Sequence, residues 1–200
     1  MDAVLAGLKW NILLVYIDDI IVFSNTVEEH LSDVGVVLDH LIEANLQLKS
    51  SKCYLFNNEL VYLGQMVSDK GFAVDPKKVV AIESMRKPKT VSEVRSFLGR
   101  CGYYRMFIHN FAALCRPLYR LTHDNVEFEW TNREDIAFDI LKKIYFKSAL
   151  LLCHPNFNFP FVIGTDASDE GIGAVLSQRY DGSVHVIQYI SRTLQPGEKK

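Results

Sequence analysis

Hydrophobic positions near the start of the chain follow first a strand pattern and then a helical one. Residues 12–24 are β-branched and apolar on both sides of Asp18 and Asp19, which predicts a tight hairpin with buried arms and both acids at its exposed tip. Thr26 and Glu29 have the spacing of a capping box, so we expect an amphipathic helix from there to about Ala44. Helical spacing predicts that its apolar face consists of Val27, Leu31, Val34, Leu38 and Leu41.

The next segment predicts a second hairpin and a short helix. Residues 49–56 and 60–67 are strand candidates separated by two asparagines, and residues 69–71 have the composition of a turn. Pro76 directly follows Asp75, a pair that caps and starts a helix, and we expect this helix to end before Pro88.

Capping boxes mark the starts of two further helices. They are formed by Thr90 with Glu93 and by Thr131 with Glu134. We expect the first helix to run to about Tyr104 and the second to about Ser148, with another helix over residues 111–121 between them. The predicted apolar face of the last helix consists of Ile136, Ile140, Leu141 and Ile144.

Strand patterns dominate the remainder of the chain. Residues 159–166, 171–179 and 184–192 are strand candidates joined by glycine-containing turns, which predicts a three-stranded meander. Residues 124–129 are the best linker candidate. Together these elements predict the α+β class, with partial hairpins and a helix first, then helices, then a truncated mixed sheet.

Composition indicates a soluble globular chain of 200 residues, 48% hydrophobic and 23% charged. No apolar run approaches the length of a bilayer span and no secretory signal is visible, so we expect no membrane partner and an intracellular, cytoplasmic location, with particle association or the nucleus as alternatives. The four cysteines are widely spaced and form no CxxC pair, which favours reduced packing thiols over a zinc site or disulfides.

Charge is distributed unevenly along the chain. Residues 1–50 hold eight acids against two lysines, whereas residues 86–120 hold eight bases against Glu93 alone, with aromatic residues interleaved. The basic stretch is the solvated face of a helix pair or the contact surface for a polyanion such as nucleic acid. Composition leaves both readings open.

Tyr16-Ile17-Asp18-Asp19 is the most informative motif. Two adjacent carboxylates at the end of apolar strands are costly unless a cation lies between or above them. Magnesium takes carboxylate and phosphate oxygens, and two such ions can activate a hydroxyl and steady a leaving group. A polar turn without a metal is the alternative, because Asp is common in turns.

Nearly the whole chain resembles the Pol polyproteins of gypsy-type long-terminal-repeat retrotransposons. The resemblance rests on MDAVLAGL, VYIDDIIVFS, VYLGQMVSDKGFAVDPKKVVAI, KPKTVSEVRSFLGRCGYYRMFIHNFAALCRPLYRLT, FEWTNREDIAFDILKKI and FVIGTDASDEGIGAVLSQ. It implies four parts: the C-terminal part of a reverse transcriptase palm (1–84), the thumb (85–123), a connecting helix and linker (124–156), and the N-terminal part of an RNase H-like domain (157–200).

The resemblance also implies roles for individual residues. Two incomplete two-metal magnesium sites would contain the catalytic carboxylates, namely Asp18 and Asp19 for the polymerase and Asp166 and Glu198 for the RNase H. Nucleic acid would be contacted by Tyr16, by the primer-gripping residues Tyr62, Leu63 and Gly64, and by the thumb residues Arg95, Gly99, Arg100, Tyr103 and Arg105. Arg95, Gly99 and Tyr103 are four apart and therefore share one helix face. The alternatives are helix packing at Gly99, strand packing at Leu63 and Gly64, and a turn acid at Asp166.

The implied parent is a multifunctional enzyme, an RNA-directed DNA polymerase (a nucleotidyltransferase) with RNase H, an endonuclease. Its partners would be a primer-template, an RNA–DNA hybrid, deoxynucleoside triphosphates and the rest of the Pol polyprotein. The chain lacks a counterpart for a further carboxylate at each site, so we expect it to be weak or inactive alone. A non-catalytic nucleic-acid-binding or interaction protein derived from the element, or a decayed reading frame, are the alternatives.

Overall fold

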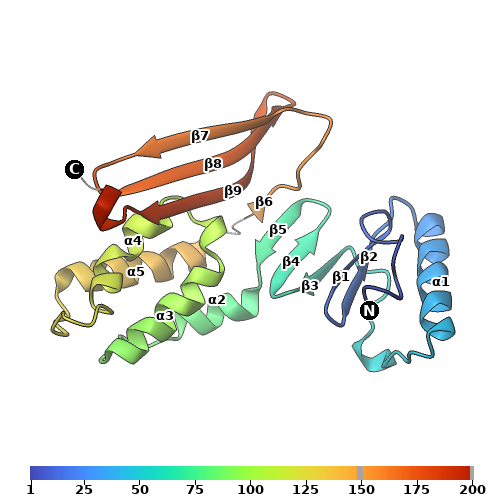
Figure 1. The fold of residues 1–200 in the computed structure, drawn as a ribbon, viewed down its shortest axis with the longest axis horizontal. Coiled ribbons are helices and arrows are strands. Elements are labelled where there is room, and N and C mark those ends of the chain that lie inside the picture. The colour runs from blue at the N-terminus through green and yellow to red at the C-terminus, as the bar shows by residue number, and fades with distance from the viewer. Residues whose placement is uncertain (148–150, 199–200) are drawn as a thin grey trace. The chain divides into compact units, whose positions relative to one another are not determined.

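The computed structural model describes residues 1–147 and 151–198 (Figure 1). The chain forms two compact units, Met1–Tyr62 and Leu63–Lys200. The first contains β1 (Leu13–Tyr16), β2 (Asp19–Val22), α1 (Val27–Glu43), the 3-10 helix η1 (Ser50–Lys52) and β3 (Glu59–Tyr62). The second contains β4 (Gln65–Ser68), β5 (Gly71–Val74), α2 (Pro76–Glu83), α3 (Val91–Tyr103), η2 (Arg105–Phe107), α4 (Phe111–Arg120), α5 (Asn132–Lys147), β6 (Leu151–Leu152), β7 (Phe161–Ala167), β8 (Gly171–Tyr180), β9 (Ser183–Thr193) and η3 (Pro196–Glu198). Helices and antiparallel sheets together confirm the α+β class.

The predicted first hairpin forms, with two differences from the expectation. β1 and β2 are antiparallel and Tyr16 pairs with Asp19, so the turn consists of Ile17 and Asp18, and Asp19 begins the second strand. Leu13 is the one buried residue of the two strands, and the others are half-buried or exposed. The prediction that both arms are buried was therefore wrong, because this two-stranded sheet meets only one small core.

Helix α1 confirms its capping box but not its predicted apolar face. The Thr26 hydroxyl accepts the Glu29 N–H at 3.1 Å, and the Glu29 carboxylate accepts the Asn25 N–H at 3.2 Å. Leu41 is buried as expected, and it is joined in the core by residues outside the predicted face, so that the core of the first unit consists of Leu5, Leu13, Val37 and Leu41. Val27 and Leu31 are 62% and 58% exposed. Helical spacing fixes which residues share a face, but not which apolar face meets the core.

The region between α1 and β4 departs most from the expectation. Residues 49–56 contain the single turn η1 in place of a strand, because the N–H groups of Lys52 and Cys53 bond carbonyls three residues back. Residues 60–67 are interrupted at Leu63 and Gly64, which both have positive φ angles of 48° and 70°. A second hairpin does form around the predicted turn, but its strands are β4 and β5.

The second unit is built around a larger core. Helices α2, α3 and α4 lie close to their predicted bounds, and the Asp75 carboxylate accepts the Lys77 N–H at 2.9 Å to cap α2. The core combines the inner faces of the four helices, with buried residues that include Val94, Phe97, Leu98, Cys101, Tyr104, Phe107, Cys115, Leu118, Phe138, Leu141 and Tyr145. Cys101 and Cys115 are thus packing thiols, as predicted, and burial raises the pKa of Cys101 to about 12.

Helix α5 confirms half of its predicted apolar face. Leu141 is buried and Ile144 packs against the core, as predicted, and the unpredicted Tyr145 is buried as well. Ile136 and Ile140 are instead 51% and 36% exposed. The Thr131–Glu134 box is confirmed, since the Glu134 carboxylate accepts the Thr131 N–H at 2.9 Å. The predicted end of this helix at Ser148 lies outside the described residues.

Two sheets complete the second unit. β4, β5 and the unpredicted short strand β6 pair in that order, and Gly71 in β5 has a φ of 133°. A Cβ at Gly71 would collide with the Leu152 carbonyl oxygen, so this approach requires glycine. β7, β8 and β9 form the predicted antiparallel meander, and Figure 1 shows α4 beside β9. There the Ala112 N–H donates to the Ser191 hydroxyl at 3.0 Å.

Candidate metal and nucleic-acid site

The predicted metal ligands in the first unit are exposed to solvent. Asp18 lies in the turn, Asp19 begins β2, and Tyr16, 56% exposed, pairs with Asp19 across the hairpin. Within residues 1–147 and 151–198, no ion pair or hydrogen bond occupies either carboxylate. Oxygen ligands of this kind suit Mg²⁺, so the hairpin fits the metal that the sequence implies.

Tyr62 lies near this hairpin. Its pKa is raised, first by partial burial and then by the negative charge of Asp19. The fold of the first unit therefore brings together Tyr16, Asp19 and Tyr62, three residues predicted from separate segments of the sequence. What each does with nucleic acid stays a prediction.

Leu63 and Gly64 lie in the second unit, where they contact α3. The Tyr103 hydroxyl donates to the Leu63 carbonyl, and the Tyr104 hydroxyl donates to the Gly64 carbonyl at 2.6 Å. A Cβ at Gly64 would lie 3.3 Å from the Tyr103 hydroxyl oxygen. Tyr104 is the residue that sequence reasoning missed, because one tyrosine beside another carries no local sign of its partner.

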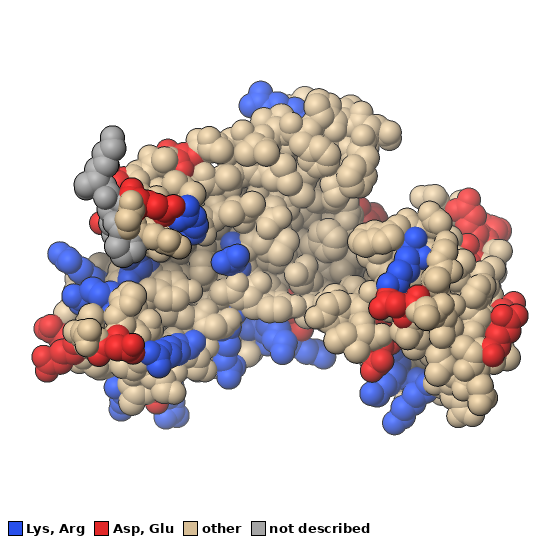
Figure 2. Space-filling view, viewed as in Figure 1, with Lys and Arg blue, Asp and Glu red and all other residues tan. Residues whose placement is uncertain are grey.

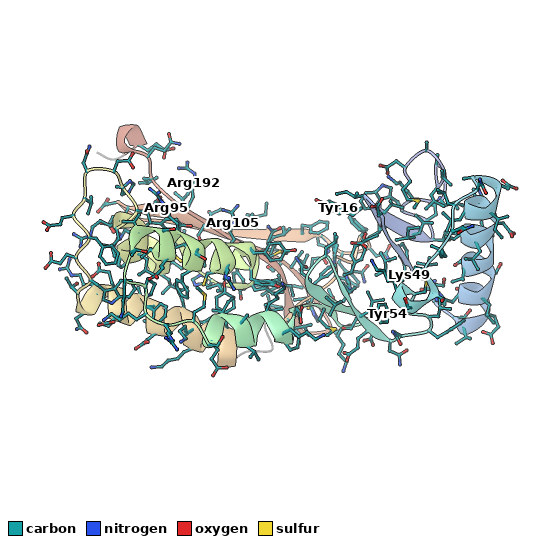
Figure 3. The ribbon with its side chains drawn as sticks, turned by 90° about the horizontal axis from the view of Figure 1, so that it is seen from below. Tyr16, Lys49, Tyr54, Arg95, Arg105 and Arg192 are labelled. Carbon is teal, nitrogen blue, oxygen red and sulfur yellow. The ribbon has the colours of Figure 1, made fainter. Side chains whose placement is uncertain are left out.

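Arg95, Gly99 and Tyr103 share the exposed face of α3, as their spacing predicts. Apart from the backbone of α3 itself, the described residues place no atom within 4 Å of a Cβ built on Gly99, so the helix surface there is open. The Arg95 guanidinium donates to the Thr122 carbonyl at 2.9 Å, which ties its side chain to the end of α4. Figure 3 shows Arg95 and Arg105 along one edge of the second unit, together with Arg192 from β9.

Positive charge remains uncompensated beside this face. Arg116 pairs with Glu170, and Arg120 approaches Glu134 at 3.5 Å. Arg100 and Arg105 are exposed, and the part of the chain that the structure describes contains no ion pair to either. Figure 2 shows many Lys and Arg over the helices of the second unit, with Asp and Glu among them at one end, and it shows Asp and Glu over α1 in the first unit. The sign of the charge thus favours an anionic ligand at α3.

The predicted RNase H carboxylates lie in different surroundings. Asp166 in β7 is exposed and lines a pocket of about 370 Å³ between the start of α4 and the sheet. Glu198, which is not among the residues that line this pocket, forms a bidentate ion pair with Arg192 at 2.6 and 2.8 Å. The Arg192 hydrogen bonds, together with the Gln195 N–H, lower the pKa of Glu198 to about 2. No described contact joins Asp166 to Glu198, and the predicted role of each stays a prediction.

Comparisons with known sequences match two parts of the chain to families. Residues 1–67 match the family "Reverse transcriptase (RNA-dependent DNA polymerase)", and residues 130–200 match the "RNase H-like domain found in reverse transcriptase". The chain is similar to the retrovirus-related Pol polyproteins from the transposons gypsy and opus of Drosophila melanogaster, at 40% and 38% identity over all of the chain. It spans 20% and 21% of the length of these relatives.

Solved structures show the same fold. The foamy viral protease-reverse transcriptase in complex with dsDNA matches all of this chain with a TM-score of 0.83 and 25% identity, over 41% of that protein. The same enzyme in complex with an RNA/DNA hybrid matches 98% of the chain with a TM-score of 0.83 and 24% identity, over 26% of its length. Of the helices described here, none has the length and apolar character needed to cross a membrane.

Proposed function

We propose that this chain holds the primer-template duplex of an RNA-directed DNA polymerase, because two of its segments match reverse transcriptase and RNase H-like families and all of it is similar to gypsy-type Pol polyproteins. The exposed face of α3 with its open Gly99 is the observation that carries this proposal. A glycine between a base and an aromatic residue lets a nucleic-acid backbone come close, while Arg100 and Arg105 supply charge for phosphates. In the first unit, Asp18 and Asp19 would hold Mg²⁺, with Tyr16 and Tyr62 near the same hairpin.

The further activities belong to the parent polyprotein in this proposal. They are DNA synthesis from deoxynucleoside triphosphates and cleavage of the RNA strand of a hybrid, with Asp166 as the first RNase H carboxylate. The division into palm, thumb, connecting segment and RNase H-like domain at residues 84, 123 and 156, the role of Glu198 and the cytoplasmic location stay predictions. So does the expectation that this chain alone extends a primer poorly, which a primer-extension assay with Mg²⁺ tests.

Binding of a fluorescent RNA–DNA hybrid by the purified chain tests the central claim. We expect Gly99→Leu to weaken binding about tenfold, because the new side chain fills the space that a sugar-phosphate backbone would occupy. Gly35→Leu is the matched control, since Gly35 is also a helical glycine whose built Cβ would have open space among the described residues outside its own helix, but it lies in α1. Equal losses in the two variants, or no binding by the unmodified chain, would contradict the proposal.

The salt dependence of the same binding tests the arginines. Replacing Arg100 and Arg105 by Gln should reduce the slope of log affinity against log salt by about one for each phosphate that is no longer neutralised. Asp18→Asn should leave hybrid affinity measured without divalent metal unchanged within about twofold. An unaltered slope in the double arginine variant would remove these residues from the interface.

A further inference from the structure

Two consecutive tyrosines at the end of α3 donate hydrogen bonds to two consecutive carbonyls of one turn. Tyr103 is the last residue of α3 and Tyr104 its C-cap, and their rings meet edge to face with centroids 4.8 Å apart. This perpendicular arrangement lets one hydroxyl reach the Leu63 carbonyl while the other reaches that of Gly64. We propose that Tyr103 and Tyr104 are positioning residues that lock the Leu63–Gly64 turn to α3, so that the turn and the duplex-binding face of the helix move as one body.

The turn needs such support. Leu63 and Gly64 have φ angles of 48° and 70°, a left-handed pair that suits glycine but disfavours leucine. Carbonyls in a two-residue turn point away from the neighbouring strands and require another donor or water. The tyrosine hydroxyls supply both donors, and the space beside Gly64 is too tight for another side chain without movement of Tyr103.

The two tyrosines contribute differently. Tyr103 is 53% exposed, so its ring remains available to a ligand while its hydroxyl is engaged. Tyr104 is 3% exposed and packs near Phe107 and Tyr145, with ring centroids 6.1 and 6.4 Å away. Burial, followed by the charge of Asp75 and the proximity of Tyr103, raises the pKa of Tyr104 to about 12, so its hydroxyl remains a donor at neutral pH. Tyr104 is thus anchored in the core and cannot contact nucleic acid itself.

Tyr104→Phe therefore removes a hydrogen bond to the turn without changing the surface that would contact nucleic acid. Tyr145→Phe is the matched control, because Tyr145 is equally buried and its hydroxyl also donates to a backbone carbonyl at 2.6 Å, that of Cys101 and not one in the turn. Hydrogen exchange of a peptide that spans residues 63–65 should become about 2- to 10-fold faster in Tyr104→Phe and in Tyr103→Phe, corresponding to the loss of one hydrogen bond. It should stay unchanged in Tyr145→Phe. Unchanged exchange in both turn variants would overturn the lock.

The positioning role has its own readout, which rests on the proposed function. A hybrid whose primer carries 2-aminopurine at its 3′ end reports the stacking of that end by fluorescence. The same base ten pairs inside the duplex serves as the internal probe. Tyr104→Phe should remove most of the terminal fluorescence change on binding, while the internal probe and the affinity change by less than about twofold. A full terminal signal in Tyr104→Phe would refute positioning even if the turn loosens.

The two proposals can fail separately. If the unmodified chain binds no hybrid, the proposed function fails, and hydrogen exchange alone still decides whether the lock exists. If hybrid binds and Gly99→Leu blocks it, but Tyr104→Phe and Tyr145→Phe give the same exchange and the same terminal signal, the function stands and the positioning role is wrong.

Discussion

The two predicted metal sites differ in what the surrounding chain does to their acids. Asp18 and Asp19 are adjacent in sequence, so one hairpin presents both, and no described ion pair involves either of them. Asp166 and Glu198 come from distant segments, and in the folded chain Glu198 forms an ion pair with Arg192. A pair of ligands that is local in sequence survives as a pair on folding, whereas a distant pair depends on every tertiary contact between its members.

The cores that support these sites also differ. Four buried residues form the core of the described first unit, whereas eighteen form the main core of the second. Because buried apolar area supplies most of the stabilising free energy, we expect the second unit to unfold at higher denaturant concentration than the first. The chain provides a reporter in each unit, since Trp10 lies in the first and Trp130 in the second.

The largest effect is expected from Gly71→Ala. The added methyl group would collide with the Leu152 carbonyl at a φ of 133°, which should cost the second unit about 2–4 kcal/mol of unfolding free energy. Urea unfolding followed separately through the two tryptophans should show this loss at Trp130 and not at Trp10. Gly182→Ala, at a positive φ but in open space, is the control. If both variants lost the same unfolding free energy, the collision with the Leu152 carbonyl would not be the cause.

The second-largest effect is expected in metal affinity, which should differ between the two predicted acidic sites. Replacing Asp18 and Asp19 together by Asn should lower Mn²⁺ affinity at least tenfold, or about 1.4 kcal/mol, because both exposed carboxylates are available as ligands. Asp69→Asn, an exposed turn acid in the second unit, should leave it unchanged. Titration of the metal's paramagnetic resonance signal measures both. If Glu198→Gln reduced affinity more than the double variant, the comparison between the sites would be reversed.

A smaller change is expected at the tip of the first hairpin. Ile17 is 71% exposed and has a φ of 55°, which disfavours a β-branched residue. Ile17→Gly should therefore stabilise the first unit by about 0.5–1 kcal/mol, as measured by urea unfolding at Trp10. Ile20→Gly, inside β2, should destabilise it. A destabilised Ile17→Gly would mean that the isoleucine side chain makes contacts worth more than the strain.

The mildest perturbation is a titration of Glu198. Its folded pKa of about 2 lies below the ordinary value of 4.5, so the Arg192 pair favours folding above pH 4.5 and loses this contribution as the pH falls through about 2. Arg192→Gln should return the pKa toward 4.5, because the bidentate hydrogen bonds are its main cause. Carboxyl ¹³C chemical shifts measured against pH give both values. A midpoint near 4.5 in the unmodified chain would show that the pair does not persist in solution.

Local features of the fold were predictable from the sequence, and long-range ones were not. The boxes at Thr26, Thr90 and Thr131 start helices as expected, since each depends on groups three residues apart. The choice of Val37 over Val27 in the first core depends on where the hairpin packs, which no helical period encodes. Residues 49–56 likewise have strand-like composition, but none of the described strands pairs with them.

The candidate site follows the same division. The exposed face of α3 was predictable because four-residue spacing places Arg95, Gly99 and Tyr103 in a row. The hydrogen bonds of Tyr104 to Gly64 and of Arg192 to Glu198 were not predictable, because the packing of other elements determines each partner.

Because β5 pairs with β6, the second unit can complete its folding only late in synthesis. Ala73 pairs with Leu151, and the helices α2 to α5 lie between them in the chain. During synthesis the exposed edge of β5 must wait until all four helices have left the ribosome, and closing so long a loop is entropically slow. A nascent chain stalled before Leu151 would thus carry an unprotected strand edge, a point at which chaperones or self-association could intervene.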